Sequence, residues 1–212
     1  VRQNLFGHSV SREEAVRYFS LDPSKKTILI LGGSLGARTI NRTLTAGLDI
    51  IRQNPGIQFI WQTGKIYIEQ VRDAITTAVG EAVHHPHINA IPNLYVTDFI
   101  KDMANAYAAA DLVISRAGAG SISEFCLLHK PVILVPSPNV AEDHQSKNAL
   151  ALVDKDAAIY VKDVEAQEKL LPVALATVKD SGKLKELSNN IAKLALPDSA
   201  TIIAKEVLKL IK

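Results

Sequence analysis

The chain has 212 residues, of which 47% are hydrophobic and 22% are charged, and its formal net charge at pH 7 is +2. This composition is that of a soluble globular protein with enough residues to bury a substantial core. No apolar run approaches the roughly 18 residues of a membrane span, no charged-then-apolar leader opens the chain, and no basic cluster alternates with aromatic residues as in nucleic-acid-binding proteins.

Six short apolar runs alternate with longer segments of helical periodicity from residue 27 onward. Strands that are apolar on both faces are typical of a parallel sheet covered by helices on each side. The sequence therefore predicts an α/β fold with a doubly wound, Rossmann-like parallel sheet. Its strands are expected at 27–31 (TILIL), 58–61 (QFIW), 93–96 (NLYV), 111–115 (DLVIS), 131–135 (PVILV) and 158–161 (AIYV).

Three helical segments have clear sequence signals. Ser11 and Glu14 have the spacing of a capping box, which predicts a short helix before the first strand. Residues 37–53 carry apolar side chains at helical spacing and end at an Asn-Pro-Gly stop. Residues 164–211 are expected to be wholly helical, and the last helix has an apolar face formed by Ile203, Val207, Leu210 and Ile211.

The first candidate site is residues 32–37 (GGSLGA), between a buried strand and a helix. Its glycines allow a tight turn that a ligand can approach closely. The free N–H groups and positive dipole end of the helix favour an anion such as a phosphate, to which Ser34 adds a hydroxyl donor. The spacing matches neither the dinucleotide motif nor the P-loop. A turn that needs glycine only for its geometry is the alternative.

The second candidate site, residues 115–124 (SRAGAGSISE), repeats the order of strand, small-residue loop and helix. Ligands of open α/β sheets bind outside the carboxyl ends of strands, where the strand order reverses, so two such loops suit one ligand with two phosphates. Ser121 and Glu124 have the spacing of a capping box, although Glu124 could equally accept hydrogen bonds from a ribose diol. Arg116 suits either a phosphate contact or a structural salt bridge.

A third polar segment, residues 136–148 (PSPNVAEDHQSKN), follows the fifth strand and passes from prolines into a helix start. Polar side chains at the carboxyl end of a strand suit a hydroxylated ligand such as a sugar. The residues alone favour a simpler interpretation, a solvated loop whose following helix is capped by Asp143.

The other reactive side chains favour structural roles. The single cysteine, Cys126, excludes an internal disulfide and a cysteine-based metal site, fits a reducing cytoplasmic setting, and stands in an apolar helix where core packing is expected. Residues 80–93 read as a surface loop, with exposed histidines rather than a metal site at His84, His85 and His87. No Ser/His/Asp nucleophilic set is present in the pattern.

Four segments together resemble the MurG family, membrane-associated enzymes that add GlcNAc to lipid I in bacterial peptidoglycan synthesis and have the two-domain GT-B architecture. The resemblance covers essentially the whole chain, but only the C-terminal, donor-binding half of the family's enzymes. Val1-Arg2 also matches the end of the family's G-N-P-V-R segment at the interdomain linker. The four segments are 32–37 (GGSLGA), 97–100 (TDFI), 115–124 (SRAGAGSISE) and 142–149 (EDHQSKNA).

The resemblance implies a UDP-GlcNAc site in this chain. Ser34 would contact the diphosphate, and Arg2 would lie beside the nucleotide. Ile100 would pair with the uracil edge through its backbone, and Glu124 would hold the ribose hydroxyls. The phosphate loop would be formed by Gly32, Gly33 and Gly36.

The resemblance also implies which residues address the sugar. His144 and Gln145 would bind GlcNAc hydroxyls, supported by Asn148, although some family members have a Gln pair where this chain has His144-Gln145. The helix start near the sugar and phosphates would be lined by Ala119, Gly120 and Ser121, where some members have Leu or Thr.

By the same resemblance, the acceptor site, the main membrane-binding patch and a His-containing loop near the proposed catalytic base belong to an N-terminal domain. We expect a linker and leading helix over 1–26, a UDP-sugar-binding domain over 27–197, and a C-terminal helix over 198–212 that would cross back to that domain. We therefore expect donor binding without turnover, because transfer needs donor and acceptor held in one geometry. No catalytic residue, metal or cofactor is expected in these residues.

The resemblance places the full-length enzyme on the cytoplasmic face of the bacterial inner membrane, with no nucleic-acid partner. Two alternatives from other classes stay open. A UDP-GlcNAc 2-epimerase-like protein shares the architecture but needs acid/base residues from across a cleft. A non-catalytic nucleotide-binding module needs only the two loops.

Overall fold

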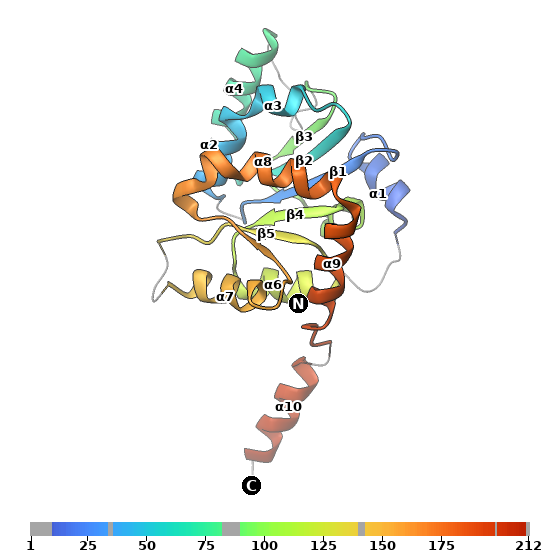
Figure 1. The fold of residues 1–212 in the computed structure, drawn as a ribbon, viewed down its shortest axis with the longest axis vertical. Coiled ribbons are helices and arrows are strands. Elements are labelled where there is room, and N and C mark those ends of the chain that lie inside the picture. Colours follow the sequence, from blue (N-terminus) through green and yellow to red (C-terminus); the bar gives the residue numbers. More distant parts are fainter. Residues whose placement is uncertain (1–9, 34–35, 82–89, 140–142, 198, 211–212) are drawn as a thin grey trace.

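The computed structural model describes residues 10–33, 36–81, 90–139, 143–197 and 199–210. Within them, six parallel strands form one sheet in the order β3-β2-β1-β4-β5-β6 (Figure 1). The predicted α/β fold is confirmed, and each predicted strand lies within one residue of its expected bounds. The strands are β1 (Lys26–Leu31), β2 (Ile57–Gln62), β3 (Leu94–Thr97), β4 (Leu112–Ser115), β5 (Val132–Leu134) and β6 (Ile159–Tyr160).

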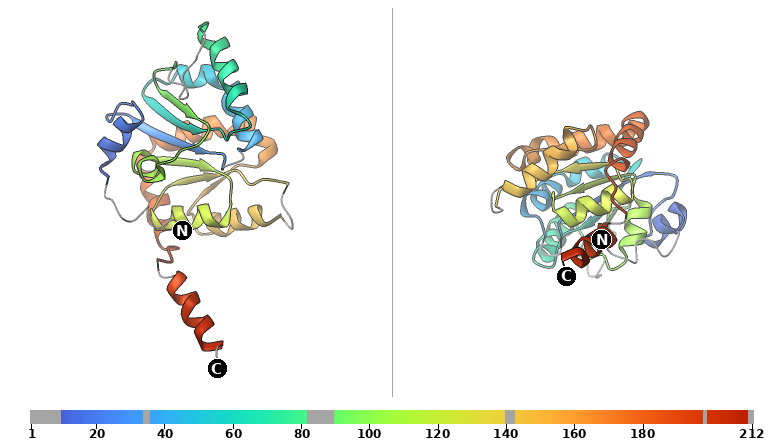
Figure 2. Two further views of the ribbon diagram at one scale, coloured as in Figure 1. Left: turned by 180° about the vertical axis from the view of Figure 1, so that it is seen from behind. Right: turned by 90° about the horizontal axis from the view of Figure 1, so that it is seen from below.

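Helices cover both faces of the sheet (Figure 2). Successive side chains of β1 explain the two layers, because Ile28 and Ile30 pack in one core and Leu29 and Leu31 pack in the other. The first core lies under α2 (Arg38–Ala46), α3 (Leu48–Arg52), α4 (Ile68–Val79) and α8 (Ala166–Lys179). The second lies under α1 (Arg12–Tyr18), α5 (Met103–Ala109), α6 (Ala119–Leu127) and α7 (His144–Val153).

The C-terminal segment was predicted to be helical throughout, and this was wrong because the segment is divided into separate helices. It begins with a 3-10 helix, η3 (Asp163–Glu165), and α8 is separated from α9 (Ser181–Ala192) by Asp180, whose side chain accepts from the Lys183 N–H at 2.9 Å. A non-helical stretch over 193–197 then precedes α10 (Ser199–Leu210), which projects away from the layered sheet (Figures 1 and 2).

The predicted helix over 37–53 is likewise two helices, α2 and α3, which meet at Gly47. A side chain at Gly47 would come within 2.0 Å of Leu171 Cδ1 on α8. A larger residue at the break would therefore have to displace the Leu171 side chain, a contact that helical periodicity alone does not reveal. The capping box of α1 is confirmed, since Ser11 Oγ accepts from the Glu14 N–H at 3.2 Å and Glu14 Oε2 accepts from the Ser11 N–H at 3.2 Å.

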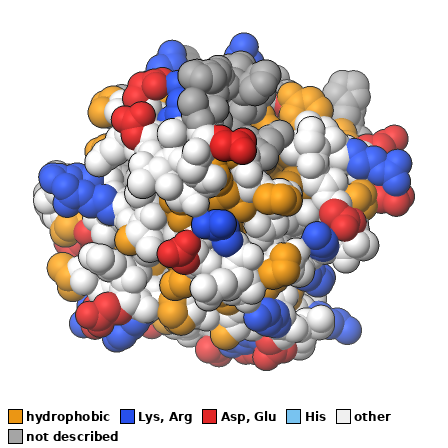
Figure 3. Space-filling model, turned by 90° about the horizontal axis from the view of Figure 1, so that it is seen from above, with side chains coloured by type: hydrophobic (Ala, Val, Ile, Leu, Met, Phe, Trp, Pro, Cys, Tyr) orange, Lys and Arg blue, Asp and Glu red, His pale blue; other side chains and the backbone are white. Residues whose placement is uncertain are grey.

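The surface agrees with the mixed charge of the sequence on the face that Figure 3 shows, where basic and acidic side chains are interspersed and the described residues form no continuous basic patch. None of the described helices is both long and apolar enough to cross a bilayer.

Asp111, just before β4, joins the leading helix to the amino end of the sheet. Its carboxylate accepts from Arg12 Nη2 at 2.8 Å, from Lys26 Nζ at 2.9 Å and from the Thr27 N–H at 2.9 Å. Burial raises the pKa of Asp111, but the hydrogen bonds from Thr27, Lys26 and Arg12 outweigh it, so its pKa is lowered from 3.8.

We expect Asp111→Asn to lower the free energy of unfolding at pH 7 by about 1–3 kcal/mol, because Arg12 and Lys26 lose their charged partner. The pKa of the folded carboxyl is depressed, so its stabilisation is present above the unfolded pKa and is lost as pH falls through the folded value, below 3.8. Urea unfolding at pH 7 and at about pH 3 should show the difference from the unaltered chain narrowing in acid. Asp49→Asn, on the surface of α3, is the control; a difference that stays constant with pH would contradict the assignment.

Candidate functional site

The carboxyl ends of β1 and β4 lie side by side where the strand order reverses. Leu31, the last residue of β1, pairs with Ser115 of β4 and with Gln62 of β2. The loops that begin at Gly32 and Arg116 therefore leave the same edge of the sheet, at its topological switch point.

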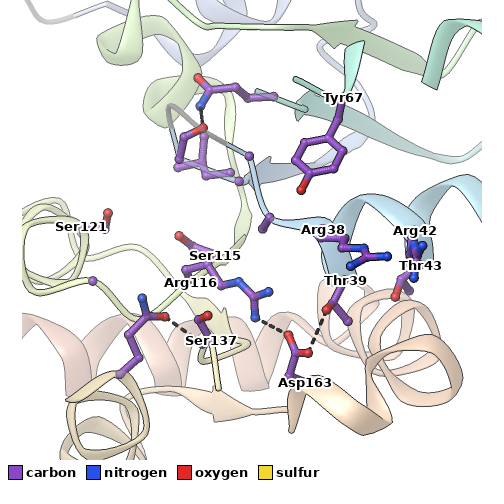
Figure 4. A pocket seen from close by; sticks show the side chains of 18 of the residues that line it. Arg38, Thr39, Arg42, Thr43, Tyr67, Ser115, Arg116, Ser121, Ser137 and Asp163 are labelled. Atoms are coloured by element: carbon purple, nitrogen blue, oxygen red, sulfur yellow. Dashed lines mark hydrogen bonds and ion pairs between the residues drawn. The ribbon is translucent and has the colours of Figure 1, made fainter. Parts of the chain in front are cut away.

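A cavity of about 990 Å³ opens at this edge (Figure 4). Its volume lies at the upper end of the range for small-molecule sites, roughly 300–1,000 Å³. Both predicted glycine-rich loops and the start of α7 contribute to its wall. The predicted residues that line it are Gly32, Gly33, Gly36, Ser121, Glu124 and Gln145.

Two helices begin at the cavity without a side-chain cap. The N-cap residues of α2 and α6 are Ala37 and Gly118, which make no side-chain hydrogen bond to the first turn, and neither first turn contains an acidic residue. Uncapped N–H groups and the positive dipole end favour an anion at such a position. The capping-box interpretation of Ser121 and Glu124 was wrong, because α6 already begins at Ala119 and Ser121 lies within its first turn.

Glycine is required in the phosphate loop for two different reasons. Gly33 and Gly36 have φ of +75° and +84°, a region that side chains disfavour. A Cβ at Gly36 would also lie 2.4 Å from the Thr63 carbonyl oxygen and 2.5 Å from the Tyr67 ring, whereas the space around Gly33 is open. Of these two glycines, Gly36 is therefore the one that is packed against the residues that follow β2.

Glu124 is buried at 7% exposure on the inner side of α6 and lines the cavity. Its Oε2 accepts from the hydroxyl of Tyr107 at 2.8 Å, and the Tyr107 ring stands edge-on to Phe125. Tyr107, on α5, thus orients the carboxylate in the cavity. The sequence analysis did not single out Tyr107, since a tyrosine in an alanine-rich helix gives no signal of its own.

Gln145 and Asn148 of α7 hold neighbouring loops together. Gln145 Oε1 accepts from the Ser137 N–H at 2.9 Å and the Ala117 N–H at 3.3 Å, and Asn148 Nδ2 donates to the Ala117 carbonyl at 3.1 Å. These bonds join the loops after β4 and β5. The expected capping role of Asp143 was wrong: it precedes α7 with φ of +54° and makes no side-chain cap.

Arg116 forms the structural salt bridge that was one of its two expected roles. It pairs with Asp163 of η3 and donates to the carbonyls of Val135 and Pro136 at 2.9 and 3.1 Å (Figure 4). Asp163 also accepts from Thr39 Oγ1 at 2.8 Å. The pair therefore connects α2, η3 and the loops after β4 and β5.

Gln62, at the end of β2, was also missed. Its side chain lines the cavity, donates to the Gly33 carbonyl at 3.0 Å and accepts from the Ile100 N–H at 2.9 Å. The sequence did contain a signal for Gln62, because it is a polar residue at the end of an apolar strand that neighbours the central strand.

Four predicted residues are described but do not line the cavity. Ile100 is buried at 3% exposure, whereas Ala119, Gly120 and His144 are exposed. Arg2 and Ser34, and the three loop histidines His84, His85 and His87, lie outside the described residues.

Cys126 is buried in the second core, and burial raises the pKa of its thiol, as expected for a packing role. Within the described part of the chain, no group of three His, Cys, Asp or Glu side chains is placed to hold a metal ion.

Comparisons with known proteins agree on this domain. The model of the Glycosyltransferase family 28 C-terminal domain matches residues 27–203. The chain is 72% identical to a Bacteroides fragilis protein, "UDP-N-acetylglucosamine--N-acetylmuramyl-(pentapeptide) pyrophosphoryl-undecaprenol N-acetylglucosamine transferase", over 99% of this chain and 53% of that protein. The chain thus spans about half the length of this curated relative.

Two solved structures show the same fold. Acinetobacter baumannii MurG aligns with a TM-score of 0.73 and 27% identity, over 94% of this chain and 53% of that one. UDP-GlcNAc 2-epimerase from Neisseria meningitidis, bound to UDP-GlcNAc, aligns with a TM-score of 0.64 over 93% of this chain and 48% of that one. Its identity is 15%, so that likeness concerns the fold alone.

The two reasons for glycine in the phosphate loop can be separated by alanine substitutions. Gly33→Ala should cost about 1–2 kcal/mol of unfolding free energy, the cost of a left-handed residue. Gly36→Ala should cost about 1–3 kcal/mol more, because its Cβ meets a backbone oxygen that cannot easily move. Urea unfolding measures both, with Gly56→Ala, in open space, as the control. Equal losses at Gly33 and Gly36 would contradict the close contact with Thr63 and Tyr67.

Proposed function

Because the chain belongs to the family of glycosyltransferase family 28 C-terminal domains, we propose that it is the donor-binding half of an inverting GlcNAc transferase. It binds UDP-GlcNAc, and the whole enzyme transfers the sugar to lipid I to make lipid II in peptidoglycan synthesis. One observation carries the proposal: two uncapped helix starts and the buried carboxylate of Glu124 share one cavity at the switch point of the sheet.

The diphosphate of the donor lies between the two helix starts. The α2 side supplies Ser34 and the phosphate loop, Gly32, Gly33 and Gly36, and the α6 side supplies Ala119, Gly120 and Ser121. During transfer, negative charge develops on the departing UDP. Fixed N–H groups and helix dipoles aimed at that charge stabilise it without reorganising.

The nucleoside lies on the side of Glu124 and Ile100. Glu124 accepts hydrogen bonds from the ribose hydroxyls, and this is supported by its burial and by Tyr107, which holds one carboxylate oxygen in place. Ile100 meets the uracil edge through its backbone, and Arg2 lies beside the nucleotide.

The sugar lies toward the start of α7. There Gln145 and His144 address the GlcNAc hydroxyls. Gln145 Oε1 already accepts from two backbone N–H groups, so the side chain contacts the sugar through Nε2, which donates to a hydroxyl oxygen. Asn148 supports Gln145 because both side chains are hydrogen-bonded to the backbone of Ala117.

The rest of the enzyme supplies the acceptor side. We propose that residues 1–26 are a linker and leading helix, that 27–197 form the UDP-sugar domain, and that 198–212 cross back to an N-terminal domain. The exposed apolar side chains Val207 and Leu208 of α10 are consistent with such a contact. That domain carries the lipid I site and the membrane contact on the cytoplasmic face of the bacterial inner membrane.

We expect the 212-residue chain to bind UDP-GlcNAc more tightly than UDP-glucose or UDP-GalNAc, and much more tightly than a dinucleotide such as NAD. Isothermal titration calorimetry with the four ligands is the test. Tighter binding of NAD than of UDP-GlcNAc would contradict the proposal. Equal affinity for all three UDP-sugars would favour a non-catalytic nucleotide-binding module.

The role of Glu124 is tested by removing the same contact from either side. The unaltered chain should prefer UDP to 2′-deoxy-UDP by about tenfold, since a hydrogen bond to a charged group contributes roughly 1.5–3 kcal/mol. In Glu124→Gln this preference should shrink to about threefold or less, because both changes remove one interaction. Glu168→Gln, exposed on α8, is the control. An unchanged preference in Glu124→Gln would show that the carboxylate does not contact the ribose.

A further inference from the structure

Gln62 lies between the phosphate loop and the turn that contains Ile100, to which the proposed function assigns the diphosphate and the base. It is the last residue of β2, and it pairs with Leu31 of β1 on one side and with Thr97 of β3 on the other. The phosphate loop follows Leu31, and the turn that contains Ile100 follows Thr97. Only 4% of Gln62 is exposed.

A single amide group joins these two loops. Nε2 donates to the Gly33 carbonyl at 3.0 Å, and Oε1 accepts from the Ile100 N–H at 2.9 Å. The reversed amide would place donor against donor and acceptor against acceptor, so the two backbone partners dictate its orientation. Both bonds are to main-chain atoms, and they therefore fix the paths of the two loops.

Among the described residues, the Gln62 bond is one of two hydrogen bonds to the Gly33 carbonyl. Gly33 is exposed, and there is open space where a Cβ would lie, so side-chain packing does not position it. Its carbonyl instead accepts from Gln62 Nε2 and from the Gly36 N–H, the latter at 3.3 Å. Loss of the Gln62 bond would therefore change the separation between the Gly33 carbonyl and the Ile100 N–H.

We propose that Gln62 is a positioning residue that holds the phosphate loop and the Ile100 turn at the separation spanned by a nucleoside diphosphate. This inference rests on the proposed function and adds to it a residue that acts through the backbone of both loops. The alternative is that Gln62 competes with the ligand. If the base had to accept a hydrogen bond from the Ile100 N–H, Gln62 would have to release that N–H first. The two roles predict opposite signs when Gln62 is replaced.

The first test is Gln62→Met, which keeps the length of the side chain and removes both hydrogen bonds. Dissociation constants are measured for UDP, uridine and inorganic diphosphate, by calorimetry or ligand-observed NMR. We expect UDP affinity to fall about tenfold and the affinity for each fragment to fall less than about threefold. A ligand that spans two subsites gains only when their separation fits it, whereas each fragment needs one subsite.

The chain contains a matched control in Gln58, at the other end of the same strand. Gln58 is also buried and also bridges, since its Nε2 donates to the Asp22 carbonyl and Thr27 Oγ1 and its Oε1 accepts from the Asp22 N–H. Gln58→Met should lower stability in urea unfolding and leave UDP affinity unchanged. An equal loss of UDP affinity in both variants would assign the effect at Gln62 to general destabilisation.

Three other outcomes would overturn the inference. A rise in UDP affinity in Gln62→Met would identify Gln62 as a competitor for the Ile100 N–H. A fall in uridine or diphosphate affinity as large as that of UDP would mean direct contact with that fragment. An unchanged UDP affinity would mean that the loops are positioned without Gln62. If the unaltered chain does not bind UDP at all, that result contradicts the proposed function itself and is distinguishable from every outcome that concerns Gln62.

Gln62→Glu gives a second readout, the pH dependence of UDP affinity. An ionised carboxylate can accept from the Ile100 N–H but cannot donate to the Gly33 carbonyl, whereas a protonated carboxyl can do both. UDP affinity, expressed relative to the unaltered chain at the same pH, should therefore recover as pH falls from 7 to about 5. The charged groups that line the cavity are the same in both proteins: Arg38, Arg42, Arg116, Glu124 and Asp163. No recovery in acid would contradict the proposed bond to Gly33.

Discussion

Parallel pairing of β1 with β2 on one side and β4 on the other is the constraint on which the rest of the structure depends. In-register pairing brings the ends of the three strands together at Leu31, Gln62 and Ser115. Because the strands are parallel, the loops that follow all leave from one edge. Two helices then begin beside each other with uncapped N–H groups directed at one cavity. The two core layers pack against the sheet from both sides.

Side-chain amides connect the loops along this edge. Gln62 joins the loops after β1 and β3, and Gln145 and Asn148 join those after β4 and β5. Asn41 does the same in the interior, donating to the Thr63 carbonyl and accepting from the Trp61 indole. An amide carries a donor and an acceptor on one rigid plane, so it can satisfy a carbonyl of one loop and an N–H of another without introducing charge. Backbone groups that pairing in the sheet leaves free are thereby satisfied.

The chemistry that the edge can support follows from its charge distribution. Helix dipoles and the N–H groups of the first turns suit an anion in the middle of the cavity, and Glu124 suits a hydroxyl donor at one side. Arg116 and Asp163 also line the cavity, and their opposite charges are paired with each other. These features support the proposal that the cavity holds a diphosphate and the groups on either side of it. The residues that would activate an acceptor are expected in the N-terminal half of the relatives, beyond the segment that aligns with this chain.

The sequence by itself determined the six strands, the capping box of α1 and the two glycine-rich helix starts, because each depends on neighbours in the chain. Only the tertiary structure revealed the break at Gly47, beside Leu171 of α8, and the true start of α6, which shows that Ser121 and Glu124 do not form a capping box. The hydrogen-bond partners of Glu124 and Gln62 could not be predicted from the sequence either. Tyr107 is far from Glu124 along the chain, and Gly33 is far from Gln62. Local signals specify elements, whereas contacts between distant residues arise only after the elements pack. The glycine-rich helix starts therefore stood out at once, and the amide that joins one of them to the Ile100 turn did not.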